Sequence, residues 1–272
     1  MFHLVAYGAS LAAGPNLDMA ASNDGILGTR NSHLICTEPF DLIAAYGIGA
    51  LITRVRFNNA QLTQKFIPHV WPLDVSATVP DIPAVMDLRT RPLRMPINEE
   101  IILEASNSGA GPTQTNTFLW MAPPGFSPSN IPSGELVGHI RGTVVIAAGA
   151  ENAWGTPVNV SWERDPLNGV YAVLACEIVA ADALAFRIVF PDMVTSRGKQ
   201  YRPGGLIQQT ASLDPWLPQR GANGGLGEWG RFHTFTPPQI QLYGDAAGGT
   251  YEVRMLLMYL GADRSLVFDG PR

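Results

Sequence analysis

The sequence predicts an all-β protein made of two tandem eight-stranded antiparallel jelly rolls, with at most short helices in loops. An internal repeat is the first observation, since ALITRVRF at Ala50–Phe57 matches ALAFRIVF at Ala183–Phe190. Short apolar runs that alternate with polar residues are the second, because period-two alternation is typical of half-buried strands. The third is the 28 glycines and 22 prolines among 272 residues, which interrupt helices but suit turns between strands.

Further matches between the two halves of the chain follow the same order as the first. Leu11–Gly14 corresponds to Ile146–Gly149, and Arg91–Met95 to Thr236–Ile240. Each half then closes on an apolar run, which is Thr117–Met121 in the first half and Met255–Tyr259 in the second. One fold used twice therefore places Arg54 and Arg187 at equivalent positions.

The boundary between the halves is expected in the segment PPGFSPSNIPSG at Pro123–Gly134. Its four prolines in twelve residues exclude a helix and a central strand. We therefore expect a first jelly roll over residues 1–124, a proline-rich linker over 125–134 and a second jelly roll over 135–272.

In the first half, the strands begin near the N-terminus. Ile52–Phe57 alternates most clearly, with Val55 and Phe57 on one face and Arg54 and Arg56 on the other. The other expected strands are Phe2–Ala13, Glu100–Ala105 and Thr115–Met121, with weaker candidates at Asn31–Cys36, Gln64–Val70 and Val85–Arg89. Phe40–Tyr46 is predicted as a short helix, because Thr37 followed by Glu38 and Pro39 is a favourable helix start.

In the second half, six strands are expected before the C-terminus. They are Leu136–Ala148, Val158–Trp162, Val170–Val179, Ala185–Phe190, Gln239–Tyr243 and Tyr251–Leu260. A short helix is predicted at Ala180–Leu184, and a long glycine- and proline-rich loop at Arg202–Gly230. About eight antiparallel strands with long connections in each half favour a jelly roll over an immunoglobulin-like sandwich.

The composition favours an assembly and disfavours nucleic acid as a partner. The chain is 46% apolar and only 15% charged, which is typical of a protein that buries much of its surface against neighbours. The net charge of −5 and the lack of a basic tail argue against nucleic-acid binding. No signal peptide and no membrane-spanning run are expected. Cys36 and Cys176 are expected to be buried free thiols.

Motifs for catalysis or cofactor binding are weak throughout. Gly225–Gly230 matches the dinucleotide pattern G-x-G-x-x-G, but no helix is expected to start there, so a glycine-rich loop around Trp229 is predicted instead. The five histidines lack the H-x-H spacing of a cupin metal site. Asp18, Asn23 and Asp24 are read as a turn and not as a calcium loop. We therefore predict no catalytic residues, no cofactor and no metal.

The chain resembles the double jelly-roll major capsid proteins of small icosahedral, lipid-containing bacteriophages. The resemblance covers nearly the whole chain and adds three segments to the repeat of Ala50–Phe57 and Ala183–Phe190. These are Arg202–Gly205, Leu226–Phe232 and the final strand Tyr251–Leu260. It implies a structural virion protein that forms homotrimers of pseudo-hexagonal outline, which tile an icosahedral shell.

The same resemblance implies the partners and the location. The chain would contact itself, neighbouring capsomers, other virion proteins such as a penton, and an internal membrane. It would be part of the virion capsid, assembled in the host cytoplasm. Trp and Arg are favoured in subunit contacts, so four residues of the second half are candidates for them: Trp216, Arg220, Trp229 and Arg231.

Two other classes of function stay open at this point. A carbohydrate-binding or adhesin module, such as a phage spike or a lectin-like protein with two β-sandwich domains, would be favoured by an exposed coplanar pair of aromatic rings on one sheet face. An enzyme of bicupin or glycosidase type would be favoured by a bound metal or by two close carboxylates in a cleft.

Overall fold

The structure, a computed structural model, describes residues 2–22, 24, 27–58, 75–76, 86–89, 92–125, 132–180, 182–193, 201–207 and 227–268. Within these residues the chain is almost entirely extended, and helix is limited to a turn at 191–193 and the 3₁₀-helix Arg264–Val267. The predicted all-β class is confirmed. Across the same residues, no helix is long and apolar enough to cross a membrane.

The chain divides into two compact units, and the division falls between Pro124 and Gly125. The N-terminal unit begins at Val5 and ends at Pro124. The C-terminal unit comprises Gly125–Arg272 together with Met1–Leu4. The first strand, β1, therefore begins with residues that group with the second half of the sequence.

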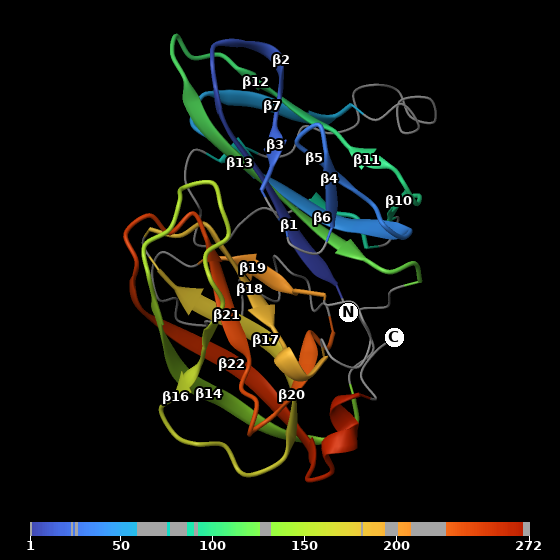
Figure 1. Cartoon of the computed structure of the whole chain (residues 1–272), viewed down its shortest axis with the longest axis vertical. Coiled ribbons are helices and arrows are strands. Elements are labelled where there is room, and N and C mark those ends of the chain that lie inside the picture. Colours follow the sequence, from blue (N-terminus) through green and yellow to red (C-terminus); the bar gives the residue numbers. More distant parts are fainter. Residues whose placement is uncertain are drawn as a thin grey trace. The chain divides into compact units, whose positions relative to one another are not determined.

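The C-terminal unit contains two antiparallel sheets (Figure 1). The first has the order β16-β14-β22-β17-β20 and the second the order β15-β21-β18-β19. The strands of the first sheet are β14 (Glu135–Ile146), β16 (Ser161–Trp162), β17 (Val170–Val179), β20 (Gly230–His233) and β22 (Gly249–Gly261). Those of the second are β15 (Val158–Asn159), β18 (Ala185–Val189), β19 (Gly204–Leu206) and β21 (Gln239–Tyr243).

These orders are those of a jelly roll. The short strands β15 and β16 follow each other with one residue between them and lie in different sheets, so together they fill one strand position. When β15 and β16 are counted as one strand, the strands of this unit are numbered 1 to 8 along the chain, from β14 to β22. In these numbers the first sheet has the order 1-8-3-6 and the second has the order 2-7-4-5. Two interlocked Greek keys, which define the jelly roll, give this arrangement.

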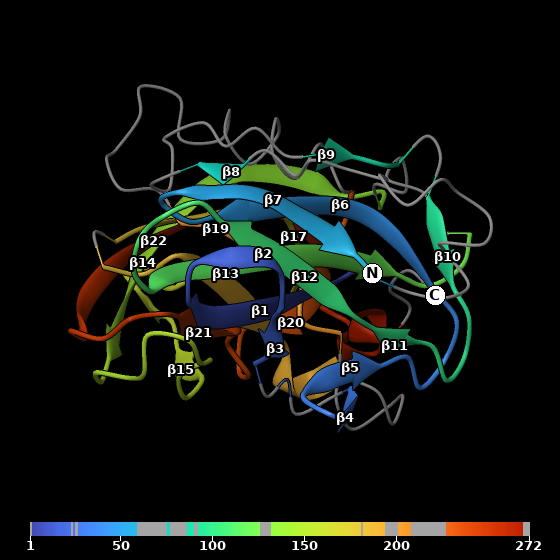
Figure 2. The same cartoon turned by 90° about the horizontal axis from the view of Figure 1, so that it is seen from above.

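The N-terminal unit has the same connectivity in its described strands. Its larger sheet has the path β10-β6-β13-β1-β3, and a smaller one has β2-β12-β7, whose strands lie side by side in Figure 2. The strands are β1 (His3–Leu11), β2 (Gly14–Asp18), β3 (Ala20–Ala21), β6 (Phe40–Ile48), β7 (Ile52–Phe57), β10 (Leu93–Met95), β12 (Leu103–Asn107) and β13 (Thr113–Ala122). The two-residue strands β8 (Val75–Ser76) and β9 (Met86–Asp87) also pair with β6.

Numbered by position in the roll, these strands give the orders 6-3-8-1 and 2-7-4. The fifth position falls between β7 and β10, where the structure describes only residues 75–76 and 86–89 in addition to the flanking residues. A third small sheet, β11-β5-β4, is added to the roll and consists of β4 (Gly28–Arg30), β5 (His33–Ile35) and β11 (Glu100–Ile101).

The helix predicted at Phe40–Tyr46 is wrong, because this segment is part of strand β6. All nine residues of β6 are buried, and the strand lies between β10 and β13 in the sheet. A strand covered on both faces has a continuous apolar sequence, which periodicity alone does not distinguish from a buried helix. The helix predicted at Ala180–Leu184 is also wrong in its described residues, which are irregular and lead into β18.

The loop predicted at Arg202–Gly230 contains one strand and the start of another, β19 and β20. Glycine is needed there because other parts of the unit approach the backbone closely. A Cβ on Gly204 would lie 2.0 Å from the carbonyl oxygen of Phe186, and one on Gly230 would lie 2.4 Å from the ring of Phe190. Glycine in these strands therefore marks close packing and not a turn.

The repeat is confirmed at three of its four matches and wrong at one. Leu11 and Ile146 end the first strand of each roll, and both closing apolar runs lie in the eighth strands, β13 and β22. Arg91–Met95 and Thr236–Ile240 do not correspond, because the first includes β10, a sixth strand, while the second reaches β21, a seventh.

Candidate functional site

Arg54 and Arg187 occupy equivalent backbone positions in the two rolls. Each is the third residue of a fourth strand, β7 or β18, and each strand pairs with the seventh strand of its roll. Arg54 is paired with Ser106 in β12, and Arg187 with Gln241 in β21. The equivalence predicted from the sequence is therefore confirmed at the level of strand order and of position within the fourth strand.

Arg187 lies fully buried in the C-terminal unit and is held by polar and aromatic contacts. Its Nη2 and Nε donate to Oε1 of Gln241 at 2.8 and 3.2 Å, and Nη1 donates to the carbonyl of Leu4 at 3.4 Å. Its guanidinium lies 3.8 Å from the ring centroid of Trp154. Because a buried cation must be hydrogen-bonded, these contacts give the side chain a structural role that links β18 to β21 and to the N-terminal segment.

Trp229 and Arg231, predicted as subunit contacts, are buried within their own unit. The indole of Trp229 is 1% exposed; it makes a T-shaped contact with Phe2, at 5.3 Å between ring centroids, and is stacked with Phe186 at 6.1 Å. Arg231 donates to both carboxylate oxygens of Glu228, at 2.6 and 3.0 Å. Both expected surface positions are therefore corrected, because these side chains fill the interior. Trp216 and Arg220 lie outside the described residues.

Exposed apolar side chains along β14 are the contact candidates that the sequence reasoning missed. Leu136, Val137 and Val145 are 59%, 46% and 68% exposed, whereas Val144 and Ile146 on either side of Val145 are buried. Period-two alternation was the available signal, since a strand that buries Val144 and Ile146 must turn Val145 outward. These residues give the first sheet of the C-terminal unit a partly apolar outer face.

Charged residues on β14, β22 and β17 lie in a row across this sheet. Arg141, Arg254 and Glu177 are cross-strand neighbours. Nε of Arg254 lies 2.5 Å from Oε1 of Glu252, and its Nη1 lies 3.6 Å from Oε2 of the fully buried Glu177. The hydrogen bond from Arg254 lowers the pKa of Glu252 below its ordinary value. This carboxylate is therefore ionised at neutral pH and is poorly suited to act as a general acid.

Two depressions lie beside the charged row. One of about 470 Å³ is lined by Val137, His139, Ile140, Arg141 and residues 163–166. The other, of about 380 Å³, is lined by residues that include Trp162, Glu163 and Glu252. The ring of Trp162 is stacked on the buried ring of Phe232, with centroids 5.9 Å apart. Because Phe232 is 1% exposed, these two rings do not form an exposed aromatic pair for a sugar.

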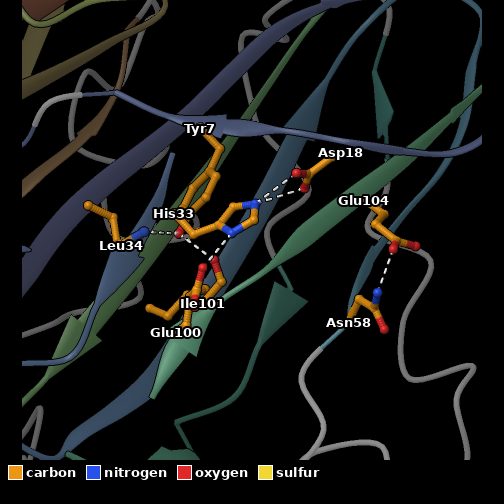
Figure 3. Close-up of polar contacts among 8 residues, drawn as sticks. All are labelled: Tyr7, Asp18, His33, Leu34, Asn58, Glu100, Ile101 and Glu104. Atoms are coloured by element: carbon orange, nitrogen blue, oxygen red, sulfur yellow. Dashed lines mark hydrogen bonds and ion pairs between the residues drawn. The ribbon is translucent and has the colours of Figure 1, made fainter. Parts of the chain in front are cut away.

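A second polar cluster lies in the N-terminal unit around His33 (Figure 3). The imidazole is nearly buried, and both of its nitrogens are in hydrogen-bond contact with carboxylates. Nδ1 lies 2.8 Å from Oε1 of Glu100, and Nε2 lies 2.8 and 3.0 Å from the two carboxylate oxygens of Asp18. The three residues come from β5, β11 and β2, so the imidazole joins the small sheet β11-β5-β4 to the sheet β2-β12-β7.

Tyr7 on β1 lies beside this cluster and completes a strand pairing. Its hydroxyl donates to the carbonyl of Ile101 at 2.7 Å and accepts the backbone N–H of Leu34 at 3.1 Å. Leu34 and Ile101 are register partners in β5 and β11, so the phenol is inserted between the two backbones. Burial raises the pKa of Tyr7 above its ordinary value, and the hydroxyl stays protonated as a donor.

Replacing Tyr7 by phenylalanine is expected to lower the free energy of unfolding of the N-terminal unit by about 1–3 kcal/mol, because one buried N–H and one buried carbonyl lose their partner. Urea denaturation followed by circular dichroism measures this. Replacing the half-buried Tyr259 by phenylalanine is the control, expected to change stability by less than about 0.5 kcal/mol. Equal effects at the two positions would contradict the assigned role of Tyr7.

The remaining sequence candidates have structural roles where they are described. Asp24 accepts the N–H of Leu27 at 3.2 Å, as expected of a turn. Residues 227–229 lead into strand β20, and no helix follows them. Cys36 and Cys176 are buried free thiols as predicted, and burial raises the pKa of Cys36 to about 12. Within the described part of the chain, no group of three or more His, Cys, Asp or Glu residues is arranged to hold a metal ion.

No family model and no curated protein matches the chain. Two solved structures are similar to it along most of its length. One is the major capsid protein P2 from bacteriophage PM2, at 9% identity and a TM-score of 0.22, with 97% of this chain and 99% of that chain covered. The other is a chain of Sulfolobus turreted icosahedral virus, at 11% identity and a TM-score of 0.25, with 98% of this chain and 94% of that chain covered. At such scores the fold assignment depends on the strand order of this chain alone.

Proposed function

We propose that this chain is the major structural subunit of an icosahedral virus shell and that it acts as a homotrimer. The observation that carries the proposal is the use of one strand order twice in a single chain. Both units arrange their described strands as 1-8-3-6 and 2-7-4, and Arg54 and Arg187 have matching positions in them. Two rolls of the same order in one polypeptide are two similar building blocks linked covalently.

Duplication matters because of symmetry. A ring of three chains with one roll each has threefold symmetry, whereas a ring of three chains with two similar rolls has six similar blocks. Such a ring fits a hexagonal lattice position with little distortion, and repeated head-to-tail contacts close into a ring when the rotation between chains is a simple fraction of a full turn. A trimer of this chain is thus a pseudo-hexagonal tile, and the shell forms when such tiles pack side by side.

The proposal also gives the partners and the location of the chain. Its first partner is itself, within the trimer and between neighbouring trimers. Other virion proteins, such as one that fills the fivefold positions, and an internal membrane complete the expected set. Nucleic acid is not among them, since the chain carries a net charge of −5. The protein belongs to the virion, after assembly in the host cytoplasm, and catalyses no reaction.

The exposed side chains of β14 are the proposed subunit contact of the C-terminal unit. Apolar side chains that are largely exposed in one chain gain by burial against another, at about 25 cal/mol per Å² of apolar surface. Leu136 and Val145 lie in different parts of the same strand, so a neighbour that covers both also covers the residues between them.

Changing both Leu136 and Val145 to aspartate is expected to weaken trimer formation about tenfold or more, because two charges would be buried in the contact. Sedimentation velocity over a concentration series measures the shift from trimer to monomer. The matched control is Thr156→Asp, which adds one charge at an exposed loop position of the same unit and should leave the trimer intact. Unchanged association of the double variant would remove β14 from the proposed contact.

A further inference from the structure

The protonation state of the His33 ring follows from the chemistry of its hydrogen-bond partners. A carboxylate only accepts hydrogen bonds, so an imidazole with a carboxylate oxygen on each nitrogen satisfies both contacts by donating from both. The contacts to Glu100 and Asp18, both at 2.8 Å, therefore call for the imidazolium form. Two other histidines of the chain differ from it: Nδ1 of His3 accepts the N–H of Arg202, and Nδ1 of His233 accepts that of Phe235.

The charged and titratable groups that face His33 come from every strand around it, and their net negative charge favours the imidazolium cation. Asp18 on β2 and Glu100 on β11 carry the negative charges, and the Tyr7 hydroxyl on β1 is neutral. Arg30 on β4, the register partner of His33, is exposed to solvent. Glu104, opposite Asp18 on β12, bonds to Arg56 and Asn58. Burial lowers the pKa of His33, but the hydrogen bonds that its ring donates to Glu100 and Asp18 outweigh this effect and leave the pKa above its ordinary value of 6.5.

The His33 imidazole attaches a β-hairpin to the rest of the N-terminal unit. Strands β4 and β5 form this hairpin, Gly28–Ile35, which pairs with the roll along the two residue pairs between β5 and β11. All three residues of β4 are exposed, so the hairpin buries little surface of its own on that side. The contact from His33 to Asp18 connects it to a second sheet. Loss of that contact would leave the hairpin joined by β11, by Tyr7 and by the hydrogen bond that the N–H of Ala21 in β3 donates to the carbonyl of Ser32 at 2.7 Å.

We propose that His33 is a pH-sensitive clamp, which as an imidazolium holds the hairpin Gly28–Ile35 to Asp18 and Glu100 and loosens it when the ring loses its proton. The clamp is a conformational device within the N-terminal unit and does not depend on the proposed function. A group whose pKa is raised by folding stabilises the fold fully below its unfolded pKa, and this stabilisation is lost as the pH rises through the folded pKa. The hairpin is therefore tightest in mildly acidic solution and loosens on the alkaline side of about 6.5.

Two measurements on the soluble, unassembled chain test the clamp. The ¹⁵N shifts of the His33 ring should be those of a doubly protonated imidazole at a pH of about 7, where an unperturbed histidine is mostly neutral. Amide exchange of β5, corrected for its intrinsic dependence on pH, should increase about tenfold between pH values of about 6 and 9. In His33→Gln, which keeps a polar side chain without the charge, exchange should be fast at both values. The control His139→Gln removes an exposed histidine of β14 in the other unit and should behave as the wild type.

A ring with one protonated nitrogen at neutral pH would overturn the proposal without any variant. So would β5 exchange that depends on pH equally in the wild type and in His33→Gln. Trimer formation is read separately by sedimentation, so a failed clamp leaves the proposed shell function standing, and a monomeric protein with an intact clamp would count only against the shell.

Discussion

Replacing Trp229 by alanine is expected to lower the free energy of unfolding of the C-terminal unit by about 3–5 kcal/mol, the usual cost of removing a fully buried large aromatic side chain. The indole packs against Phe2 and Phe186, and the backbone N–H of Trp229 donates to the carbonyl of Val173 at 2.8 Å. The cavity left by alanine would lie between the two sheets and the N-terminal segment. Guanidinium denaturation followed by circular dichroism measures the loss.

Phe235→Ala is the matched control, because it removes another aromatic ring of the same segment that is 74% exposed. Its expected effect is within about 0.5 kcal/mol. If the two variants lost similar stability, or if Trp229→Ala formed monomers of full stability, the indole would belong to a subunit contact, as the sequence alone suggested.

Replacing Gly204 by alanine is the second large effect, with an expected loss of about 3 kcal/mol or more, at the upper end of overpacking costs. The added Cβ would lie 2.0 Å from the Phe186 carbonyl oxygen, which belongs to the backbone of the neighbouring strand and moves only if β18 moves. Thermal unfolding of the purified variant measures the loss.

Gly28→Ala is the control for this substitution, since Gly28 also begins a strand, and a Cβ there would have no atom within 4 Å. It should be neutral or slightly stabilising, because alanine lowers the entropy of the unfolded chain. A Gly204→Ala protein as stable as the Gly28→Ala protein would show that β19 does not pack on β18 as described.

Much of the fold was predictable because strands that bury one face keep their alternation. Ile52–Phe57 buries Val55 and Phe57 and matches β7 residue for residue. Gln239–Tyr243 matches β21 because its sequence alternates, although four of its five residues are buried. The internal repeat was visible for the same reason, since the fourth and eighth strands of both rolls meet similar neighbours. Strand β6 was missed because it is buried on both faces, and β19 because glycine in a sequence suggests a turn.

The candidate sites were far less predictable. Asp18, His33 and Glu100 are distant in sequence and meet only because β2, β5 and β11 lie together, so their spacing carries no signal. Trp229 and Arg231 were expected at a surface because tryptophan and arginine are common in contacts, yet the same residue types also fill interiors when a stacking ring or a carboxylate is at hand. Residue type alone does not separate these two outcomes.

Whether three chains with two rolls each form a six-block tile is tested most directly by the mass and outline of the purified, unliganded protein, measured by light scattering and by electron microscopy of single particles. A particle of three times the 29.3 kDa of one chain, with a hexagonal outline, is the predicted result. A protein that stays monomeric even at high protein concentration would contradict the proposed trimer.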